Sequence, residues 1–143
     1  MSKIVVIDGQ GGKLGRLVIE QLKMSDKVSY EIRAIGTNSI ATATMLKAGA
    51  DSGATGENPV VVNCRDADII VGPIGIIAAD ALYGEVTAAM AAAVGSSSAH
   101  KVLLPMSRCR ISVMGIKPAI STTELVNMAV QKIFQLIGAS DNA

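Results

Sequence analysis

A chain of 143 residues has the length of one domain, long enough to bury about two thirds of the surface that its unfolded form exposes. Its net charge of +1, its 2% of aromatic residues and the lack of a basic block argue against a nucleic-acid-binding protein. Only 17% of the residues are charged, against about 25% in typical domains, so few polar side chains are left to cover a monomer and we expect a homo-oligomer.

The apolar stretches of the chain indicate neither a targeting signal nor a membrane segment. The first run ends at Asp8, before the apolar part of a secretory signal would be complete. The longest uncharged stretches, residues 69–79 and 86–99, fall short of the roughly 18 residues that span a bilayer. We therefore expect a cytoplasmic protein without a membrane partner.

The two cysteines and the single histidine give no sign of a metal site. Cys64 and Cys109 lie far apart and form no CxxC pair, so neither a disulfide framework nor a zinc site is indicated. His100 has no second potential metal ligand at a useful spacing. We therefore expect no bound metal from these residues.

The first two strand and helix units follow one another over the first 48 residues. An apolar, β-branched run at residues 4–7 predicts the first strand, and the helix after it, about Lys13 to Met24, has its apolar residues on one face and its charged residues on the other. Residues 29–35 predict the second strand. The turn Gly36–Ser39 then supplies N-cap chemistry for a helix over Ile40–Ala48.

The middle of the chain predicts two more strands. Residues 50–55 favour a short third strand, and Asn58-Pro59 favours a brief helix, because proline is tolerated at the first helical position. Val60–Val62 argues equally for a strand there. Residues 67–71 form a continuous apolar run, typical of a parallel strand buried on both faces, and end in Gly72-Pro73-Ile74-Gly75.

The last third of the chain predicts helices around one or two strands. Two alanine-rich helices are expected over residues 74–82 and 86–94, followed by a strand at 101–104. Residues 111–116 predict a last edge strand, with an antiparallel course left open. The final helix begins at a capping box and runs over about residues 121–137, with an apolar face wider than one sheet requires. The surplus face predicts a contact with another subunit.

Strands and helices alternate in this plan as they do in βαβ units. The sequence therefore predicts an α/β fold, a three-layer, doubly wound and mainly parallel sheet of Rossmann-like type with about five to six strands. We expect a single domain over residues 1–143, in which the first glycine-rich turn would lie where such folds bind nucleotides.

The turn after the first strand carries glycines at a spacing that suits phosphate binding. Gly9, Gly12 and Gly15 fit a G-x-x-G-x-x-G pattern, which allows a tight bend, close approach of a pyrophosphate and packing of the helix on the sheet. Gly9 and Gly11 also begin a G-x-G-x-x-G pattern, but Leu14 replaces its third glycine. The residues around the turn do not match a Walker loop, so ATP hydrolysis of that kind is disfavoured.

An acidic residue usually follows the second strand in dinucleotide-binding folds, where it binds a ribose. Here Thr37 and Asn38 stand at that place, so NADP, a mononucleotide or another phosphorylated ligand stay open, and FMN fits less well because the first turn is not rich in Ser and Thr. Asp8 at the tip of the first strand would repel an anion unless Lys13 or a cation neutralises it, and it could instead orient a ribose or hold magnesium. A turn without a ligand is the alternative.

The sequence contains no familiar catalytic arrangement. Neither tyrosine has a lysine four residues later, as in short-chain dehydrogenases, and no serine lies in a G-x-S-x-G elbow. An enzyme would have to rely on carboxylates for acid and base chemistry. The candidates are Asp8, Glu57 and Glu85.

Several glycine-bearing segments together carry a resemblance that covers nearly the whole chain. They are residues 7–12, 36–42, 48–51, 53–58, 72–75 and 84–87. With these segments the chain resembles a family of short bacterial proteins catalogued only as a domain of unknown function. The resemblance implies a bacterial cytosolic protein and suggests that the segments belong to one site, but it supplies no activity.

The sequence favours a nucleotide- or dinucleotide-binding protein, regulatory or ligand-sensing and oligomeric, with NAD(P) or another nucleotide as its ligand. A small oxidoreductase or nucleotide-modifying enzyme, and a structural oligomer without a ligand, are the alternatives. The residues expected to bind the ligand are Asp8, Gly9, Gln10, Gly11, Gly12, Leu14, Gly15, Gly36, Thr37, Asn38, Ser39, Gly72, Pro73, Ile74 and Gly75.

Overall fold

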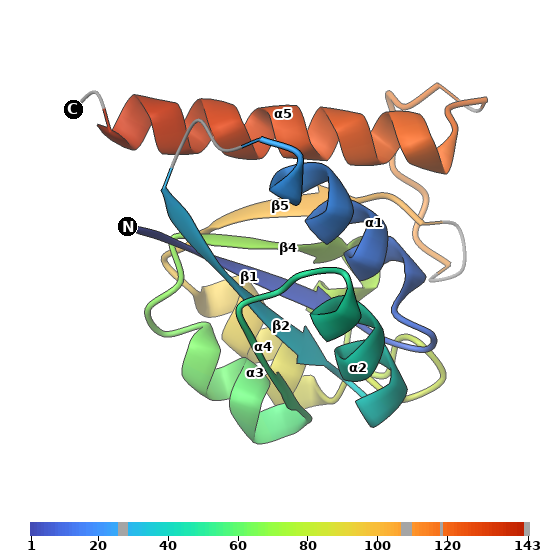
Figure 1. Ribbon diagram of the computed structural model, residues 1–143. Coiled ribbons are helices and arrows are strands. Elements are labelled where there is room, and N and C mark those ends of the chain that lie inside the picture. Colours follow the sequence, from blue (N-terminus) through green and yellow to red (C-terminus); the bar gives the residue numbers. More distant parts are fainter. Residues whose placement is uncertain (26–28, 107–109, 118, 142–143) are drawn as a thin grey trace.

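The computed structural model describes residues 1–25, 29–106, 110–117 and 119–141 (Figure 1). Its strands form one parallel sheet in the order β3-β2-β1-β4-β5, which confirms the predicted α/β class. The sheet consists of β1 (Ser2–Asp8), β2 (Tyr30–Gly36), β3 (Ser52–Thr55), β4 (Ile69–Pro73) and β5 (His100–Leu104).

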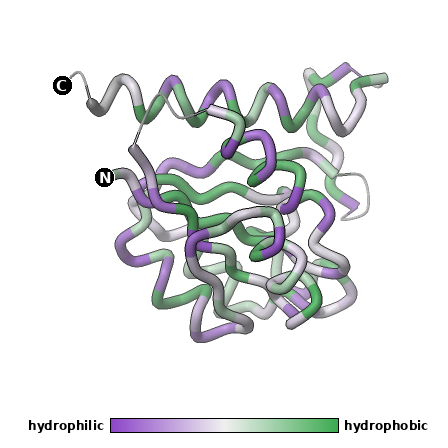
Figure 2. Tube along the Cα trace, in the orientation of Figure 1, coloured by the Kyte–Doolittle hydropathy of each residue, from purple (hydrophilic) through white to green (hydrophobic). Residues whose placement is uncertain are grey.

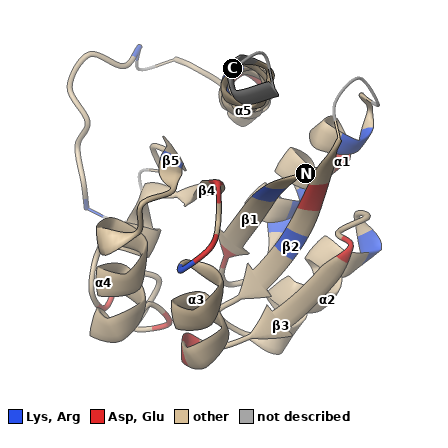
Figure 3. Cartoon of the chain, turned by 90° about the vertical axis from the view of Figure 1, so that its left-hand side faces the viewer, with Lys and Arg blue, Asp and Glu red and all other residues tan. Residues whose placement is uncertain are grey.

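Helices cover both faces of the sheet and make the fold three-layered. Figure 3 shows α3 and α4 on one side of the sheet and α1 and α2 on the other. The last helix, α5, packs beside α1 and against β5. The helices are α1 (Lys13–Lys23), α2 (Ser39–Lys47), α3 (Glu57–Asn63), the short 3-10 helix η1 (Ile74–Ile77), α4 (Ala88–Ser96) and α5 (Thr122–Asp141).

The burial of the central strand β1 explains why this sequence favours a parallel sheet with helices on both faces. Its residues Ile4, Val5, Val6 and Ile7 are at most 1% exposed, because β1 pairs on both edges and is covered on both faces. Ile4 and Val6 belong to the core under α1, α2 and α5, whereas Val5 and Ile7 belong to the core under α3 and α4. Figure 2 shows the hydrophobic colour running through these central strands.

The strand order places a crevice at the carboxyl edge of the sheet. From β1 the chain proceeds outward to β2 and β3, and it then crosses back to β4 on the other side of β1. In such sheets the crevice outside the carboxyl ends of the two strands at this switch point is where ligands bind. Here those strands are β1 and β4, and the register that pairs Asp8 with Gly36 sets the end of β2 beside them.

Three predicted elements differ from the structure. Residues 74–82 form no α-helix: η1 spans four residues, and the turns that follow include Asp80, Leu82 and Tyr83 at positive φ angles of 67°, 56° and 56°. The backbone there turns back on itself instead of continuing helically, as the hydrogen bond from Asp80 N–H to the carbonyl of Val86 shows, at 2.7 Å. The next helix, α4, begins at Ala88 and not at 86, because the Thr87 hydroxyl caps it.

The described part of residues 111–116 also forms no strand. β5 ends at the carboxyl edge of the sheet, and α5 begins at the same edge, where Met106 and Thr122 line one pocket. A strand of this length would carry the chain about 20 Å toward the opposite edge. Residues 111–116 lie in turns and irregular structure instead, so the sheet has five strands and no antiparallel member among the described residues.

The wide apolar face of α5 is mostly used within the chain. Five of its apolar side chains are buried and three more are partly buried, because α5 lies against both α1 and β5. Phe134 also contacts Tyr30, with the ring centroids 6.2 Å apart. Met128, at 58% exposure, is the one exposed member of that set. Among the described residues, no helix has both the length and the apolar character needed to cross a membrane.

Candidate functional site

The turn between β1 and α1 has the tight geometry that its glycines predict. The Gly12 N–H donates to the Gly9 carbonyl at 2.9 Å, and Gln10 and Gly12 have left-handed φ angles of 48° and 75°. A side chain on Gly12 would begin 2.8 Å from the Cα of Ala41 in α2. Glycine is therefore required at position 12 by both its conformation and its neighbour.

Asp8 lies under this turn and binds its backbone. Its carboxylate accepts the N–H groups of Gly9 at 2.8 Å and Gly15 at 2.7 Å, and the residue is 6% exposed. Burial raises the pKa of Asp8, against the opposing effect of the hydrogen bonds from Gly15 and Gly9, and the nearby negative charge of Glu85 adds to the rise. The sequence suggested that Lys13 or a cation would neutralise this carboxylate, but the backbone donors at the start of α1 do so.

Asp8 therefore occupies part of the anion-binding position at the α1 N-terminus. Two other backbone donors of the turn, the N–H groups of Gly11 and Lys13, have no acceptor among the described residues. Both residues are exposed, and the Lys13 side chain forms no ion pair with any described carboxylate. The start of α1 thus keeps two free donors and one free positive charge for an external anion.

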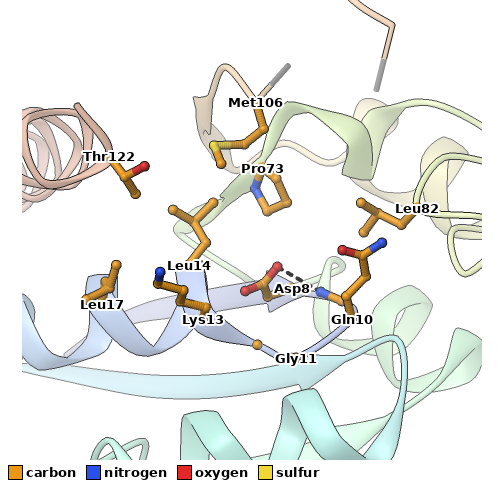
Figure 4. Close-up of a pocket in the computed structure, with 12 residues that line it drawn as sticks. Asp8, Gln10, Gly11, Lys13, Leu14, Leu17, Pro73, Leu82, Met106 and Thr122 are labelled. Carbon is orange, nitrogen blue, oxygen red and sulfur yellow. Dashed lines mark hydrogen bonds between the residues drawn. The ribbon is translucent and has the colours of Figure 1, made fainter. Parts of the chain in front are cut away.

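A pocket of about 300 Å³ lies at the switch point between β1 and β4 (Figure 4). Its walls come from four places in the chain: the β1 to α1 turn, the end of β4, the segment after η1, and the connection from β5 to α5. Its volume is at the lower end of the range for small-molecule sites. The lining residues are Asp8, Gly9, Gln10, Gly11, Gly12, Lys13, Leu14, Leu17, Pro73, Leu82, Met106 and Thr122.

The pocket combines an apolar wall with a few polar groups. Apolar side chains, Leu14, Leu17 and Met106 among them, line the pocket together with the Asp8 carboxylate. This composition is typical of sites for small organic ligands, in which a few polar groups fix the orientation of the bound molecule. A ligand here would meet hydrogen-bond donors at the turn and an acceptor at Asp8.

A second polar cluster lies on the β2 side of the same turn and centres on Glu85. Its Oε1 accepts hydrogen bonds from the Gln10 N–H at 3.0 Å, the Thr37 hydroxyl at 2.7 Å and the Asn38 amide at 2.6 Å. Burial acts to raise the pKa of Glu85, but the bonds from Gln10, Asn38 and Thr37 together hold it below its ordinary value. Glu85 is therefore a fixed, ionised group.

Asn38 connects this cluster to α2 and to the turn. Its side-chain oxygen accepts the Ala41 N–H at 2.8 Å and so caps α2, as the sequence predicts for this turn. Its amide also donates to the Gln10 carbonyl at 2.8 Å. The cluster thus ties the ends of β1 and β2 to the segment before α4.

That segment, residues 78–87, packs directly on the turn. A side chain on Gly9 would begin 2.7 Å from Cδ1 of Leu82 and 2.6 Å from Oγ1 of Thr37. The three non-glycine residues of the segment with positive φ, Asp80, Leu82 and Tyr83, each cost about 1–2 kcal/mol in backbone strain. Tyr83 is 97% exposed and gains nothing from burial, so the contacts of the segment must offset the strain.

The residues that the sequence predicted to bind the ligand do not all lie in one place. Some line the pocket, and others lie at the Glu85 cluster or in neighbouring helices. Gly36, Thr37 and Asn38 lie at the Glu85 cluster or beside it and do not line the pocket. Ser39 is the exposed first residue of α2, while Ile74 and Gly75 lie in η1. The residues that the pocket brings together are Asp8, Gly9, Gln10, Gly11, Gly12, Leu14 and Pro73. Gly15 contributes its N–H to Asp8, and Gly72 packs against β1 below Pro73.

Sequence reasoning missed several residues of the site. Leu82, Met106 and Thr122 reach the pocket from distant parts of the chain, and no local pattern marks them. The sequence suggested Glu85 as an acid or base and placed it in one of the glycine-bearing segments of the site, but it did not indicate that Glu85 accepts hydrogen bonds from Thr37 and Asn38. The hydrogen-bond donors on these two side chains after β2 were the signal for such an acceptor. Glu57, the third carboxylate considered, accepts a hydrogen bond from the Thr87 hydroxyl at 2.6 Å. Within the described ranges, no three His, Cys, Asp or Glu side chains are grouped so that they could hold a metal ion.

Comparison with known proteins gives a family but no activity. No curated protein matches the sequence. Among solved structures, the chain is similar to the dodecameric FMN-dependent Ubix-like decarboxylase from Escherichia coli O157:H7, with 16% identity, coverage of 94% of both chains and a TM-score of 0.48. A likeness of this degree gives no indication of activity, cofactor or assembly. Residues 3–138 match the family described as "Domain of unknown function (DUF3842)". The match extends over nearly the whole sequence, and the chain therefore belongs to this family.

Proposed function

We propose that this chain is a nucleotide-binding protein, regulatory or ligand-sensing, whose site is the pocket between β1 and β4. The observation that carries the proposal is the joint position of that pocket and the α1 N-terminus. Gly11 and Lys13, whose N–H groups are free, both line the pocket, which lies at the switch point of a parallel sheet. Helix N-termini at this place bind phosphate in many α/β proteins.

The polar groups of the pocket suggest how a nucleotide would lie in it. A phosphate would accept from Gly11 and Lys13, with the charge of the Lys13 side chain nearby, because Asp8 already uses the N–H groups of Gly9 and Gly15. The Asp8 carboxylate would then accept a hydrogen bond from a hydroxyl or amino group of the ligand. NAD(P) and mononucleotides both offer such groups.

The state of the three candidate carboxylates favours binding over catalysis. Glu85 is held by three donors, and Glu57 is held by Thr87. Asp8 alone is a carboxylate in the pocket with a raised pKa, which is the specific observation that favours the second candidate, a nucleotide-modifying enzyme. Turnover of a nucleotide that Asp8→Asn abolishes, with binding intact, would establish the enzyme.

We also propose that the protein works as a homo-oligomer in the cytoplasm. Residues 113–116, between β5 and α5, lie outside the sheet and expose apolar side chains, with Met114 83% exposed, Val113 38% and Ile116 37%. Exposed apolar residues that lie together are typical of protein contacts. Sedimentation velocity at micromolar concentration should give a dimer or a larger species, and a single species of monomer mass would contradict the proposal.

Gly11 offers a matched pair of variants for testing the binding site. A side chain at this position would meet no atom within 4 Å, so both Gly11→Asp and Gly11→Asn should fold. The aspartate adds a negative charge at the phosphate position, and the asparagine adds the same volume without charge. We expect AMP, at about 100 times its Kd, to stabilise the wild type by about 2.7 kcal/mol in thermal unfolding.

The asparagine variant should keep most of this stabilisation and the aspartate variant should lose it. NAD, NADP, ATP, FMN and coenzyme A complete the panel. If no nucleotide stabilises the wild type, or if both variants respond as the wild type does, the proposed function is wrong.

A further inference from the structure

The corner between the carboxyl ends of β1 and β2 is filled by the chain itself. In sheets of this strand order a dinucleotide lies across the switch point, with its adenosine half over the second strand and its ribose bound by an acidic residue there. In this chain Leu82 and Glu85, from the segment before α4, occupy that corner.

The contacts around Gly9 show how completely the corner is filled. The first atom of a side chain on Gly9 would lie 2.7 Å from the Leu82 side chain and 3.2 Å from Oε1 of Glu85. In dinucleotide-binding turns the first glycine makes the tight bend, and the adenosine half of the ligand lies beyond it over the second strand. Here Leu82 and Glu85 pack against the first glycine, and Glu85 binds Thr37 and Asn38 at the end of β2.

The hydrogen-bonding groups of the corner are also taken. The Thr37 hydroxyl and the Asn38 amide, which could bind a ribose, both donate to Glu85. The Glu85 carboxylate would in addition repel the phosphates of a dinucleotide, and the 2′-phosphate of NADP most of all. The pocket on the β4 side shares Gln10 with this network, but the side chains of its Asp8 and Thr122 form no hydrogen bond with Glu85, Thr37 or Asn38 among the described residues.

The inference from these contacts rests on the proposed function and narrows the class of ligand. We propose that Glu85 is a specificity-determining residue, which closes the adenosine side of the cleft and so restricts the ligand to a mononucleotide in the pocket between β1 and β4. Dinucleotide-binding proteins carry a carboxylate after the second strand that binds the ribose. In this chain the Glu85 carboxylate occupies that place and excludes the ribose.

Glu85 can have this effect because it fastens a strained segment. The turns of residues 78–86 are closed by bonds within the segment, such as the one between the Val86 N–H and the Ala81 carbonyl at 3.1 Å. The three hydrogen bonds of the Glu85 carboxylate join the segment to β2 and to the first turn. Removal of this side chain frees Thr37 and Asn38 and lets the strained backbone move away from Gly9.

Isothermal titration calorimetry with AMP and NAD tests the proposal on the full chain. The wild type should bind AMP at least about tenfold more tightly than NAD. Glu85→Ala should tighten NAD binding by about tenfold and change the Kd of AMP by less than about threefold. Glu85→Gln keeps an acceptor oxygen of the same shape but removes the charge, so it should tighten NAD binding by a smaller factor than Glu85→Ala does. Glu57→Ala, which removes a carboxylate outside the corner, is the control and should change neither Kd.

A second variant covers the case in which Glu85→Ala does not fold. Thr37→Val has nearly the same volume, removes one of the three donors, and should shift the ratio of the two Kd values in the same direction by a smaller factor.

Equal affinity of the wild type for AMP and NAD would overturn the inference while leaving the proposed function intact. The same holds if amide exchange of residues 80–86 becomes faster in Glu85→Ala but NAD still does not bind. Failure of every nucleotide to bind the wild type would instead overturn the proposed function, and this inference with it.

Discussion

Replacement of Asp8 by asparagine tests whether this carboxylate is part of the architecture of the turn. Asparagine keeps one oxygen for an N–H donor but presents an amide group to the other, so either Gly9 or Gly15 loses its acceptor. A buried N–H without a partner costs about 1–3 kcal/mol. Loss of the negative charge at the start of α1 adds about 0.3–1 kcal/mol, and relief of the buried charge offsets part of the total. We expect a net loss of about 2 kcal/mol near neutral pH.

The pH dependence of this loss has a definite sign. Burial raises the pKa of Asp8 in the folded chain above its ordinary value of 3.8, so the folded state holds this proton more tightly than the unfolded state does. The stability that Asp8 contributes through its proton is therefore fully present below that value and falls as the pH rises through the folded pKa. Asparagine has no such dependence. The wild type should thus exceed Asp8→Asn in stability by more near about pH 4 than near about pH 7.

Urea denaturation of both proteins at several pH values measures the two free energies of unfolding. Asp51→Asn is a suitable control, because Asp51 also accepts a backbone N–H, that of Ile32 at 2.8 Å, but is exposed. The amide oxygen of asparagine can still accept this single N–H, so the control should lose less than about 1 kcal/mol. An Asp8→Asn variant as stable as the wild type, or a difference that grows with pH, would refute this account of the turn.

Three further predictions concern other parts of the molecule. Gly12→Ala should lower the free energy of unfolding by more than about 2 kcal/mol, because of its φ and its contact with α2, whereas Gly11→Ala should stay within about 0.5 kcal/mol in the same urea titration. The hydrogen bonds to Glu85 lower its pKa, so the stability that Glu85 contributes is present above its ordinary pKa of 4.5 and is lost as the pH falls through the pKa of the folded state. Glu85→Gln should therefore weaken the loss of stability at acidic pH. A loss as large as in the wild type would contradict the role of the cluster. Burial raises the pKa of the Cys64 thiol to about 11, so iodoacetamide should alkylate it far more slowly than it alkylates glutathione near pH 8, with mass spectrometry as the readout.

The elements with a strong local period could be predicted from the sequence. α1 has one buried face, of which Leu14, Val18 and Leu22 are part, and β1 has an unbroken β-branched run, so both patterns agree with their tertiary environment. The helix predicted over residues 74–82 was wrong. The apolar and alanine-rich composition of these residues favours a helix, but the tertiary contacts of Leu82 and Glu85 hold the backbone in left-handed turns. The alternation at 111–116 is a β pattern without a neighbouring strand in the sheet.

In the candidate site, too, the residues with a local sequence pattern could be predicted and the others could not. The turn from Asp8 to Gly15 could be found because glycine spacing is a local property of the backbone, and the structure places most of the turn on the pocket. The other wall could not be found, because Leu82, Met106 and Thr122 come together only through the strand order. The contact between Glu85 and Asn38 spans 47 positions and has no sequence pattern either.

Titration of the ¹⁵N-labelled protein with AMP, followed by amide chemical shifts, tests the central claim most directly. The two free donors at the start of α1, Gly11 and Lys13, should show the largest shifts, and saturation should occur at one AMP for each chain. Thr37 and Asn38, on the closed side of the turn, should shift little. Shifts centred on α3 and α4, or no shifts at millimolar AMP, would contradict the claim that the crevice between β1 and β4 is a nucleotide site.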